Sequence, residues 1–483
     1  MAEQTLKEKT SKGLFWGGMS SFLQQLISAL FGIYLARVLS PGDYGLVGML
    51  TIFTMIAQIL QEAGFSSALI NRKVICHEDY NAVFWFSMIV SVLCYVVLFF
   101  CAPLIARFFH HAELVKLARW TFLGFILSGL MVSPSALLNK QLKIREKAIT
   151  NIAAIIVSGF LGVFFAFKGY GYWALTIQSL VFSMLRVIGF WYYSKWRPSL
   201  SIVFSPIKEM FSYSVRLLIT SLVGVVNSNL VTIVIGRRYA ADRVGYYTQA
   251  NKWFTVGNMV LIEMVGSVSQ PVLAEVLSDT DRQLRVFRKL IRFAAFISFP
   301  AMLGLGFITP EFISLVLTEK WADSIPLMQI LCIAGAFTPV MDVMVFLLLS
   351  RGRSDIHMWA NIARFIAVLG AVILAYPFGI KVMVLGVTIV NTLWLFIWHF
   401  FVRKEIGYTY MALLKDLSPC FIISIISIIL TFVITKSFFS GWALLAAKII
   451  ITAFLYFSIL LLSGSPTFKE CTEYIRTKFN KEM

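Results

Sequence analysis

Long, uninterrupted apolar blocks are the feature of this sequence that most restricts its fold. Runs of about 20 to 28 mostly apolar residues follow one another along the chain, separated by short polar segments. A helix needs about 20 residues to cross the ~30 Å hydrocarbon layer, whereas membrane β-strands alternate apolar and polar residues over ~10 positions. The blocks therefore predict an all-α integral membrane protein.

The composition supports this prediction and excludes other classes. Hydrophobic residues make up 59% of the 483 positions and charged residues only 14%, against roughly 45 to 50% and about 25% in soluble domains. The net charge of +18 comes from basic residues in short loops, as membrane topology requires, so no nucleic-acid partner is expected. The six cysteines form no CxxC pair, and we expect neither a metal site nor a bound cofactor.

Apolar runs bounded by charges, proline or glycine predict about fourteen transmembrane helices. The first twelve fall into two groups of six, and two more helices complete the chain. The predicted spans are 13–37, 43–70, 80–106, 116–139, 148–168 and 171–194, then 211–236, 246–277, 289–309, 325–350, 356–377 and 380–402, and finally 411–435 and 441–463.

The span pattern predicts five segments. An N-terminal lobe of six helices covers 1–194, and a cytoplasmic linker covers 195–210. A C-terminal lobe of six helices covers 211–402, and the last two helices lie within 403–464. Mixed basic and apolar residues over 465–483 predict an interfacial amphipathic tail.

The loops predict the orientation of the chain. With the N-terminus in the cytoplasm, that side collects about 24 Lys and Arg residues and the other side roughly 11, as the positive-inside rule requires. An even number of spans then places both termini in the cytoplasm. The loops are also too short for a soluble catalytic domain, so we do not expect an enzyme.

An internal repeat relates the two groups of six spans. The segment LARVLSPGDYGLVGML recurs 200 residues later in outline as IGRRYAADRVGYYTQA, so that Arg37 matches Arg237 and Gly45 matches Gly245. Each match lies at the junction between the first two helices of its group. The repeat predicts two parallel bundles with a substrate path between them.

These segments also carry a family resemblance. SKGLFWGGMSSFLQQLISALFGIYLARVLSPGDYGLVGM, QEAGFSSALINRK and RRYAADRVGYYTQANKW resemble the polysaccharide transporters of the multidrug, oligosaccharidyl-lipid and polysaccharide exporter superfamily. Within it, they are most similar to the Wzx-like flippases, which include colanic acid and teichuronic acid exporters. The resemblance implies fourteen helices: two six-helix lobes plus two.

The resemblance also implies a function. Such proteins move undecaprenyl-diphosphate-linked oligosaccharides from the cytoplasmic to the outer leaflet of the bacterial inner membrane for assembly of O-antigen, capsule or exopolysaccharide. We expect a monomer that works by alternating access, with a polysaccharide polymerase or ligase as a further partner. The alternatives are a small-molecule or multidrug exporter of the same superfamily, coupled to a cation, and a membrane-embedded polysaccharide polymerase or transferase.

Cationic residues inside the spans are candidates for binding a diphosphate headgroup. A charge at the bilayer centre costs about 2.5 to 3.5 kcal/mol on insertion scales, so such residues are rare unless they have a function. The alternative is that they lie near an interface and extend their charged ends to water. The four candidates are Arg186, Arg216, Lys252 and Arg364.

Neutral polar residues concentrate in the first two spans of each group. Gln58 and Gln61, with Glu62, lie at positions i, i+3 and i+4 and share one helical face. They predict a polar path for a sugar, and hydrogen bonding between helices is the alternative. The predicted sugar-contacting residues are Gln24, Gln25, Gln58, Gln61, Asn227 and Asn229.

Three acidic residues are candidates for coupling transport to Na⁺ or H⁺. They are Glu62, Glu263 and Asp342. A carboxylate within the membrane can bind a proton or a metal ion near neutral pH because burial disfavours its charged form. Pairing with a cation to support folding is the alternative.

Overall fold

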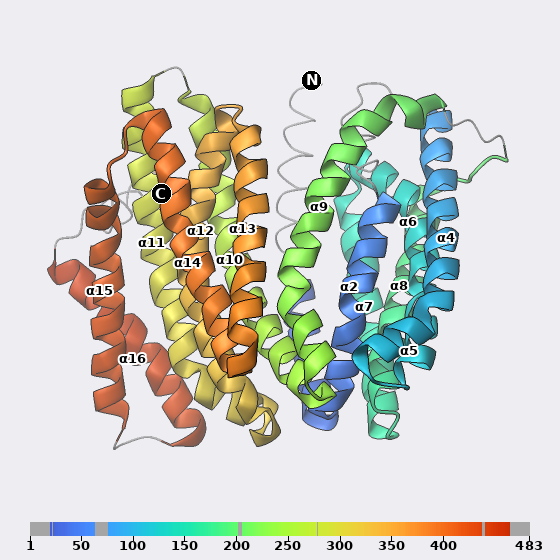
Figure 1. Cartoon of the computed structure of the whole chain (residues 1–483), viewed down its shortest axis with the longest axis horizontal. Helices are drawn as coiled ribbons and strands as arrows, with labels where there is room; N and C mark the ends of the chain where they lie inside the picture. The colour runs from blue at the N-terminus through green and yellow to red at the C-terminus, as the bar shows by residue number, and fades with distance from the viewer. Residues whose placement is uncertain are drawn as a thin grey trace, which may run out of the picture. The chain divides into compact units, whose positions relative to one another are not determined.

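The computed structural model describes residues 20–21, 23–62, 76–200, 205–277, 279–436 and 440–463, and the regular structure within these ranges is helical (Figure 1). Twelve of the described helices are long and apolar enough to cross a membrane. The helix Leu23–Val38 and α9 (Ser205–Arg238) lie at two further predicted spans. The all-α membrane fold is therefore confirmed, while the predicted tail over 465–483 lies outside the described residues.

The chain divides into two compact units, Met1–Gly245 and Tyr246–Met483. This division falls within α10 (Ala241–Glu275), so α9 belongs to the first unit. The two six-helix lobes, joined by a linker over 195–210, stay a prediction. After Leu23–Val38 the first unit contains α2 (Pro41–Glu62), α4 (His77–Phe109), α5 (Leu114–Thr121), α6 (Leu123–Lys140), α7 (Ile144–Phe167), α8 (Tyr172–Ser194) and α9.

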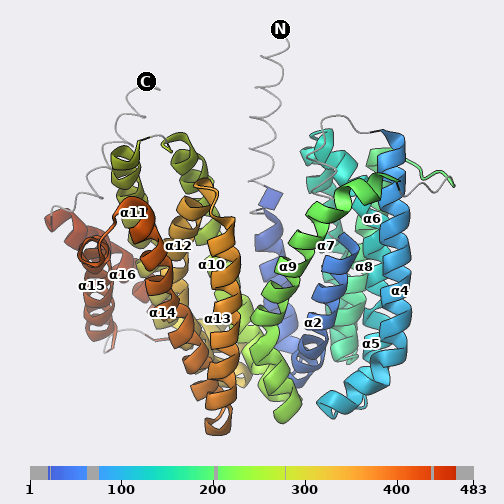
Figure 2. The same ribbon diagram turned by 45° about the horizontal axis from the view of Figure 1, so that its top comes forward.

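The second unit contains most of α10 and the helices that follow. Between α11 (Thr280–Glu311) and α12 (Ile325–Ser350) the chain forms a π-helical turn, Phe312–Leu317, and a 3₁₀ turn, Glu319–Ser324. The remaining helices are α13 (Ser354–Ala375), α14 (Ile380–Ile406), α15 (Tyr410–Thr435) and α16 (Gly441–Leu462). Both α15 and α16 pack against α11 (Figure 2).

The sequence SPGD explains why α2 begins where it does. The main-chain N–H of Ser40 donates to Oδ2 of Asp43 at 2.9 Å, and the N–H of Asp43 donates to Oγ of Ser40 at 3.2 Å. These reciprocal bonds satisfy main-chain donors that the first turn of a helix leaves free. Pro41 occupies the first helical position, where its missing N–H costs nothing.

Two glycines of the repeated segment allow the first turns of α2 and α10 to approach each other. A Cβ atom on Gly45 would overlap the carbonyl oxygen of Ala241, and one on Gly245 would overlap that of Pro41. All four residues belong to the first unit. The two matched positions of the repeat therefore each meet the main chain at the start of the other helix, and each requires glycine because the obstacle is main chain.

The beginning of the predicted linker is packed rather than free. Trp196 is buried in an aromatic cluster with Tyr80 and Phe84 of α4. Nε1 of Trp85 donates to the Ser199 carbonyl at 2.8 Å. This segment is therefore fixed to α4 up to the end of its described part at residue 200.

A charged network joins α11 to α15 in the second unit. The guanidinium of Arg288 donates to both carboxylate oxygens of Asp416, at 2.9 and 3.0 Å. The Tyr408 hydroxyl donates to the same carboxylate at 2.9 Å. Burial, and next the negative charge of Asp416, raise the pKa of Tyr408, so the phenol stays protonated and continues to donate.

Candidate functional site

The structure describes the side chains of three of the four predicted phosphate-binding cations. Arg186 lies on α8 in the first unit, and Lys252 on α10 and Arg364 on α13 lie in the second. All three are half-buried, and the side chain of Arg216 lies outside the described residues. The Arg186 guanidinium carbon lies 5.3 Å from the ring centres of two phenylalanines of its own helix. Such contacts stabilise a cation away from bulk water.

One predicted cation interacts electrostatically with a predicted acid. Arg364 on α13 and Asp342 on α12 are both half-buried and attract each other electrostatically. Nε of Arg364 is buried and makes no hydrogen bond to the described residues. Glu263 is exposed on α10, and the side chain of Glu62 lies outside the described part. Among the candidate acids whose side chains the structure describes, Asp342 is half-buried and is attracted by a predicted cation.

The predicted sugar-contacting residues separate into different environments. Gln24 bonds to Ser20 within its own helix, and Gln25 is exposed. Asn229 is buried and bonds to the Val225 carbonyl at 2.9 Å. Oδ1 of Asn227 is buried and makes no hydrogen bond to the described residues.

Gln58 and Gln61 have different roles although they share one helical face. Gln61 is only 1% exposed, and its amide donates to the Phe125 carbonyl at 3.1 Å, joining α2 to α6. Gln58 instead lines a cavity of about 310 Å³ inside the first unit. The structure therefore gives Gln61 an interhelical contact and gives Gln58 access to the cavity.

The polar lining of this cavity, which we call the hydroxyl cavity, follows one helical spacing on three segments. On each segment, three lining residues lie at i, i+3 and i+7 and therefore share one helical face. They are Thr51, Thr54 and Gln58 on α2; Thr121 and Ser128, with Gly124 between them, on the α5–α6 segment; and Thr176, Ser179 and Ser183 on α8. The apolar residues Val47, Leu50, Phe125 and Leu175 complete the lining. Sequence reasoning recognised only Gln58, although the shared spacing was a readable signal.

The hydroxyl cavity presents both acceptors and donors. Thr54 donates its hydroxyl hydrogen to the Thr51 carbonyl at 2.7 Å, and Thr176 donates to the Tyr172 carbonyl at 3.4 Å. Their oxygens retain lone pairs. Gln58 and the three lining serines make no hydrogen bond to the described residues. The cavity lining carries no charged side chain.

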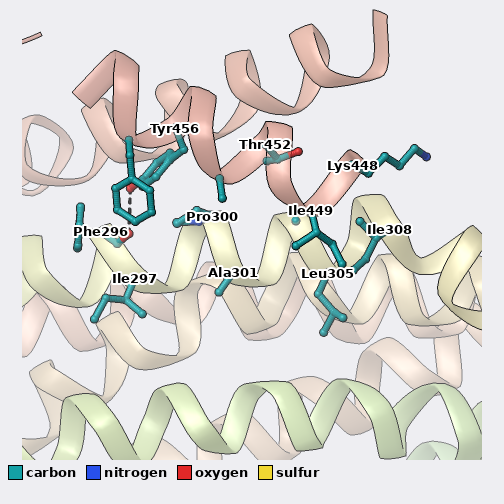
Figure 3. A pocket seen from close by; sticks show the side chains of 13 residues that line it. Phe296, Ile297, Pro300, Ala301, Leu305, Ile308, Lys448, Ile449, Thr452 and Tyr456 are labelled. Carbon is teal, nitrogen blue, oxygen red and sulfur yellow. Dashed lines mark hydrogen bonds between the residues drawn. The ribbon is translucent and has the colours of Figure 1, made fainter. Parts of the chain in front are cut away.

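A groove of about 380 Å³ in the second unit has the opposite chemistry. It runs between α11 and α16, and its lining is apolar apart from Thr452, Tyr456 and Lys448 (Figure 3). The Tyr456 hydroxyl donates to the Phe296 carbonyl at 2.9 Å. In a regular helix this carbonyl would accept from the main-chain N–H four residues later, but Pro300 at that position has no N–H. This apolar groove fits a hydrocarbon chain.

A buried ion pair joins the two helices of the apolar groove. Nζ of Lys448 on α16 lies 2.6 Å from Oε1 of Glu311 at the end of α11, with side chains 8% and 15% exposed. Nζ also lies 4.4 Å from the ring centre of Phe307. A buried pair of this kind fixes the register of two helices, because separating it leaves an unpaired charge.

Comparisons with known proteins agree with this architecture. A family model described as "Polysaccharide biosynthesis protein" matches residues 34–326. Lipopolysaccharide biosynthesis protein WzxC of Escherichia coli (strain K12) is 25% identical over 438 residues, which cover 89% of this chain and 88% of that protein. Teichuronic acid biosynthesis protein TuaB of Bacillus subtilis (strain 168) is 25% identical over 355 residues, 73% of either chain.

A solved structure has the same fold. The lipid II flippase MurJ in an inward closed conformation matches with a TM-score of 0.78 at 14% identity, covering 94% of this chain and 99% of that chain. This similarity shows the fold alone. Together the comparisons confirm the predicted resemblance and membrane fold, and they place the chain with transport proteins rather than enzymes.

Proposed function

The chain belongs to the polysaccharide biosynthesis protein family, and from this premise we propose that it is a flippase for undecaprenyl-diphosphate-linked oligosaccharides. It moves them by alternating access from the cytoplasmic to the outer leaflet of a bacterial inner membrane, with both termini in the cytoplasm. The names of its relatives support a role in building a surface polysaccharide. The excess of Lys and Arg in alternate loops supports the orientation.

One observation carries the proposal: a single membrane chain offers both an uncharged polar cavity and an apolar groove. The hydroxyl cavity measures about 310 Å³ and the apolar groove about 380 Å³, within the range of ligand sites. A lipid-linked sugar needs polar contacts for its glycan and apolar contacts for its prenyl chain.

The half-buried cations are the proposed partners of the diphosphate. Arginine binds phosphate through two parallel hydrogen bonds, and lysine supplies a point charge. The proposal gives the role of binding the diphosphate to Arg186, Arg216, Lys252 and Arg364. Asp342 is the proposed coupling site for Na⁺ or H⁺. It interacts electrostatically with Arg364, so its charge would respond to a phosphate bound at Arg364.

Deletion of the gene in its own host tests the proposed function. We expect loss of one surface polysaccharide and accumulation of its lipid-linked precursor on the cytoplasmic side. Complementation with Lys252→Ala or Arg216→Ala should restore protein in the membrane but less polysaccharide, by about tenfold if one charge-assisted contact of ~1.5 kcal/mol is lost. Lys381→Ala, at an exposed position of α14, is the matched control and should restore polymer fully. Normal polymer in the deletion strain would contradict the proposal.

A further inference from the structure

We propose that the hydroxyl cavity of the first unit binds a neutral hexose of the glycan and so selects the sugar that is transported. This inference rests on the proposed function and adds a place and a chemical class for sugar recognition. It concerns a cavity within one unit, enclosed by α2, the α5–α6 segment and α8.

The polar groups of the cavity match a polyhydroxylated ligand. A sugar hydroxyl both donates and accepts, so it needs mixed partners. The hydroxyl groups of Thr54 and Thr176 already donate to main-chain carbonyls, and their oxygens can still accept a hydrogen bond. Gln58 and Ser128 make no hydrogen bond to the described residues and can donate as well. Oγ1 of Thr121 is buried and likewise has no partner in the described part of the chain.

The absence of charge in the lining decides which sugars fit. An acidic sugar would bring a carboxylate into a cavity whose lining offers it no cation, and an isolated buried charge is strongly disfavoured. A small metal ion is also excluded as the main ligand, because Ca²⁺ and Mg²⁺ sites are built around carboxylates. A neutral ligand rich in hydroxyl groups is therefore favoured.

Phe125 adds an aromatic surface to the lining. The residue is 4% exposed, and its ring stacks on that of Phe122 with centres 5.2 Å apart and planes at 17°. Its carbonyl accepts the Gln61 amide at 3.1 Å, which holds this turn of α6 against α2. The small exposed part of Phe125 adds an apolar contact beside the hydroxyl groups of the lining. The volume of about 310 Å³ equals roughly ten water molecules at ~30 Å³ each, enough for a hexose with some water.

Binding of defined lipids to the full chain in nanodiscs tests the inference. The probes are undecaprenyl diphosphate, undecaprenyl-diphosphate-glucose and -galactose, and undecaprenyl-diphosphate-glucuronate, with affinities measured by native mass spectrometry. A neutral hexose should strengthen binding by about tenfold over the sugar-free lipid, the value of two or three neutral hydrogen bonds, and glucuronate should not. In Gln58→Leu/Thr176→Val the gain should fall below about twofold, because these near-isosteric changes remove the polar atoms.

The control separates binding from folding. Thr150 on α7 is also buried and also donates to a main-chain carbonyl, at 2.9 Å, but it lies outside the cavity lining. Thr150→Val should keep the full gain. A gain that persists in the double variant, or no gain for either neutral hexose in the wild type, overturns the inference while leaving the flippase proposal intact.

Failure of the proposed function has a different signature. If the sugar-free lipid itself does not bind, the diphosphate-lipid substrate is wrong. Equilibrium dialysis with radiolabelled methyl glucoside then decides the cavity by itself: binding that Gln58→Leu/Thr176→Val abolishes supports the hexose site, and no binding overturns it.

Discussion

The hydroxyl cavity and the apolar groove are similar in volume, about 310 and 380 Å³, but differ in how they are built. Three helices of the first unit each supply a polar stripe, and most of their hydroxyls keep some hydrogen-bonding capacity for a ligand. Two helices of the second unit supply mainly apolar side chains, and the three polar side chains of the groove all have protein partners. Lys448 bonds to Glu311, Tyr456 to the Phe296 carbonyl, and Thr452 to Thr431 of α15. Unpaired polar groups indicate ligand recognition, and paired ones indicate structure.

Glu311→Ala should have the largest effect, because it removes one partner of the buried ion pair between α11 and α16. It leaves the Lys448 ammonium buried beside the Phe307 ring without its carboxylate. We expect a loss of about 3–5 kcal/mol in stability, seen as a lower midpoint of thermal unfolding in detergent. Replacing both residues by methionine should recover most of the loss, since well-packed apolar residues can substitute for a buried ion pair. An unchanged midpoint in Glu311→Ala would mean that the pair does not join α11 to α16.

Filling the groove should affect transport more than stability. Ala301→Trp places an indole among the lining residues, and we expect at least about tenfold less surface polysaccharide, equivalent to ~1.4 kcal/mol of lost prenyl-chain binding. Ile450→Trp is the matched control because Ile450 lies on α16 beside the groove but is 67% exposed. Equal polymer from both variants would remove the groove from the substrate path.

Tyr456→Phe should have the smallest effect of the three. It deletes the hydroxyl that donates to the Phe296 carbonyl at 2.9 Å, and a neutral hydrogen bond contributes about 0.5–1.5 kcal/mol to stability. The unfolding midpoint should fall slightly, with polysaccharide unchanged. Tyr192→Phe, at a position 73% exposed, should leave the midpoint where it is. A large loss of polymer in Tyr456→Phe would show that this hydroxyl contacts substrate.

The helices could be predicted from the sequence because each is encoded locally. A block of about 20 apolar residues must span the membrane wherever it packs, and SPGD marks the beginning of α2 by contacts within four residues. The groove could not be predicted in this way. Its ion pair joins residues 137 positions apart, and nothing near Lys448 in the sequence indicates Glu311 as its partner.

The site residues show how far pattern alone can go. The sequence identifies each polar side chain inside a span separately, so it predicts one role for Gln58 and Gln61. The structure separates them because the partner of Gln61 is a main-chain carbonyl on α6, which no side-chain pattern records. The hydroxyl stripes were missed because threonine and serine in a helix commonly bond to their own main chain. The stripes become informative only when the same spacing is seen to recur on α2, on the α5–α6 segment and on α8.

The close approaches of Gly45 to Ala241 and of Gly245 to Pro41 limit how the two copies of the repeated segment can diverge. Elsewhere, a larger residue on one helix can be accommodated by a smaller one on its neighbour. Here each glycine meets main chain, and no substitution shortens a carbonyl group. The two positions are therefore fixed together, and a random mutational library selected for function should return glycine at both while the flanking residues vary.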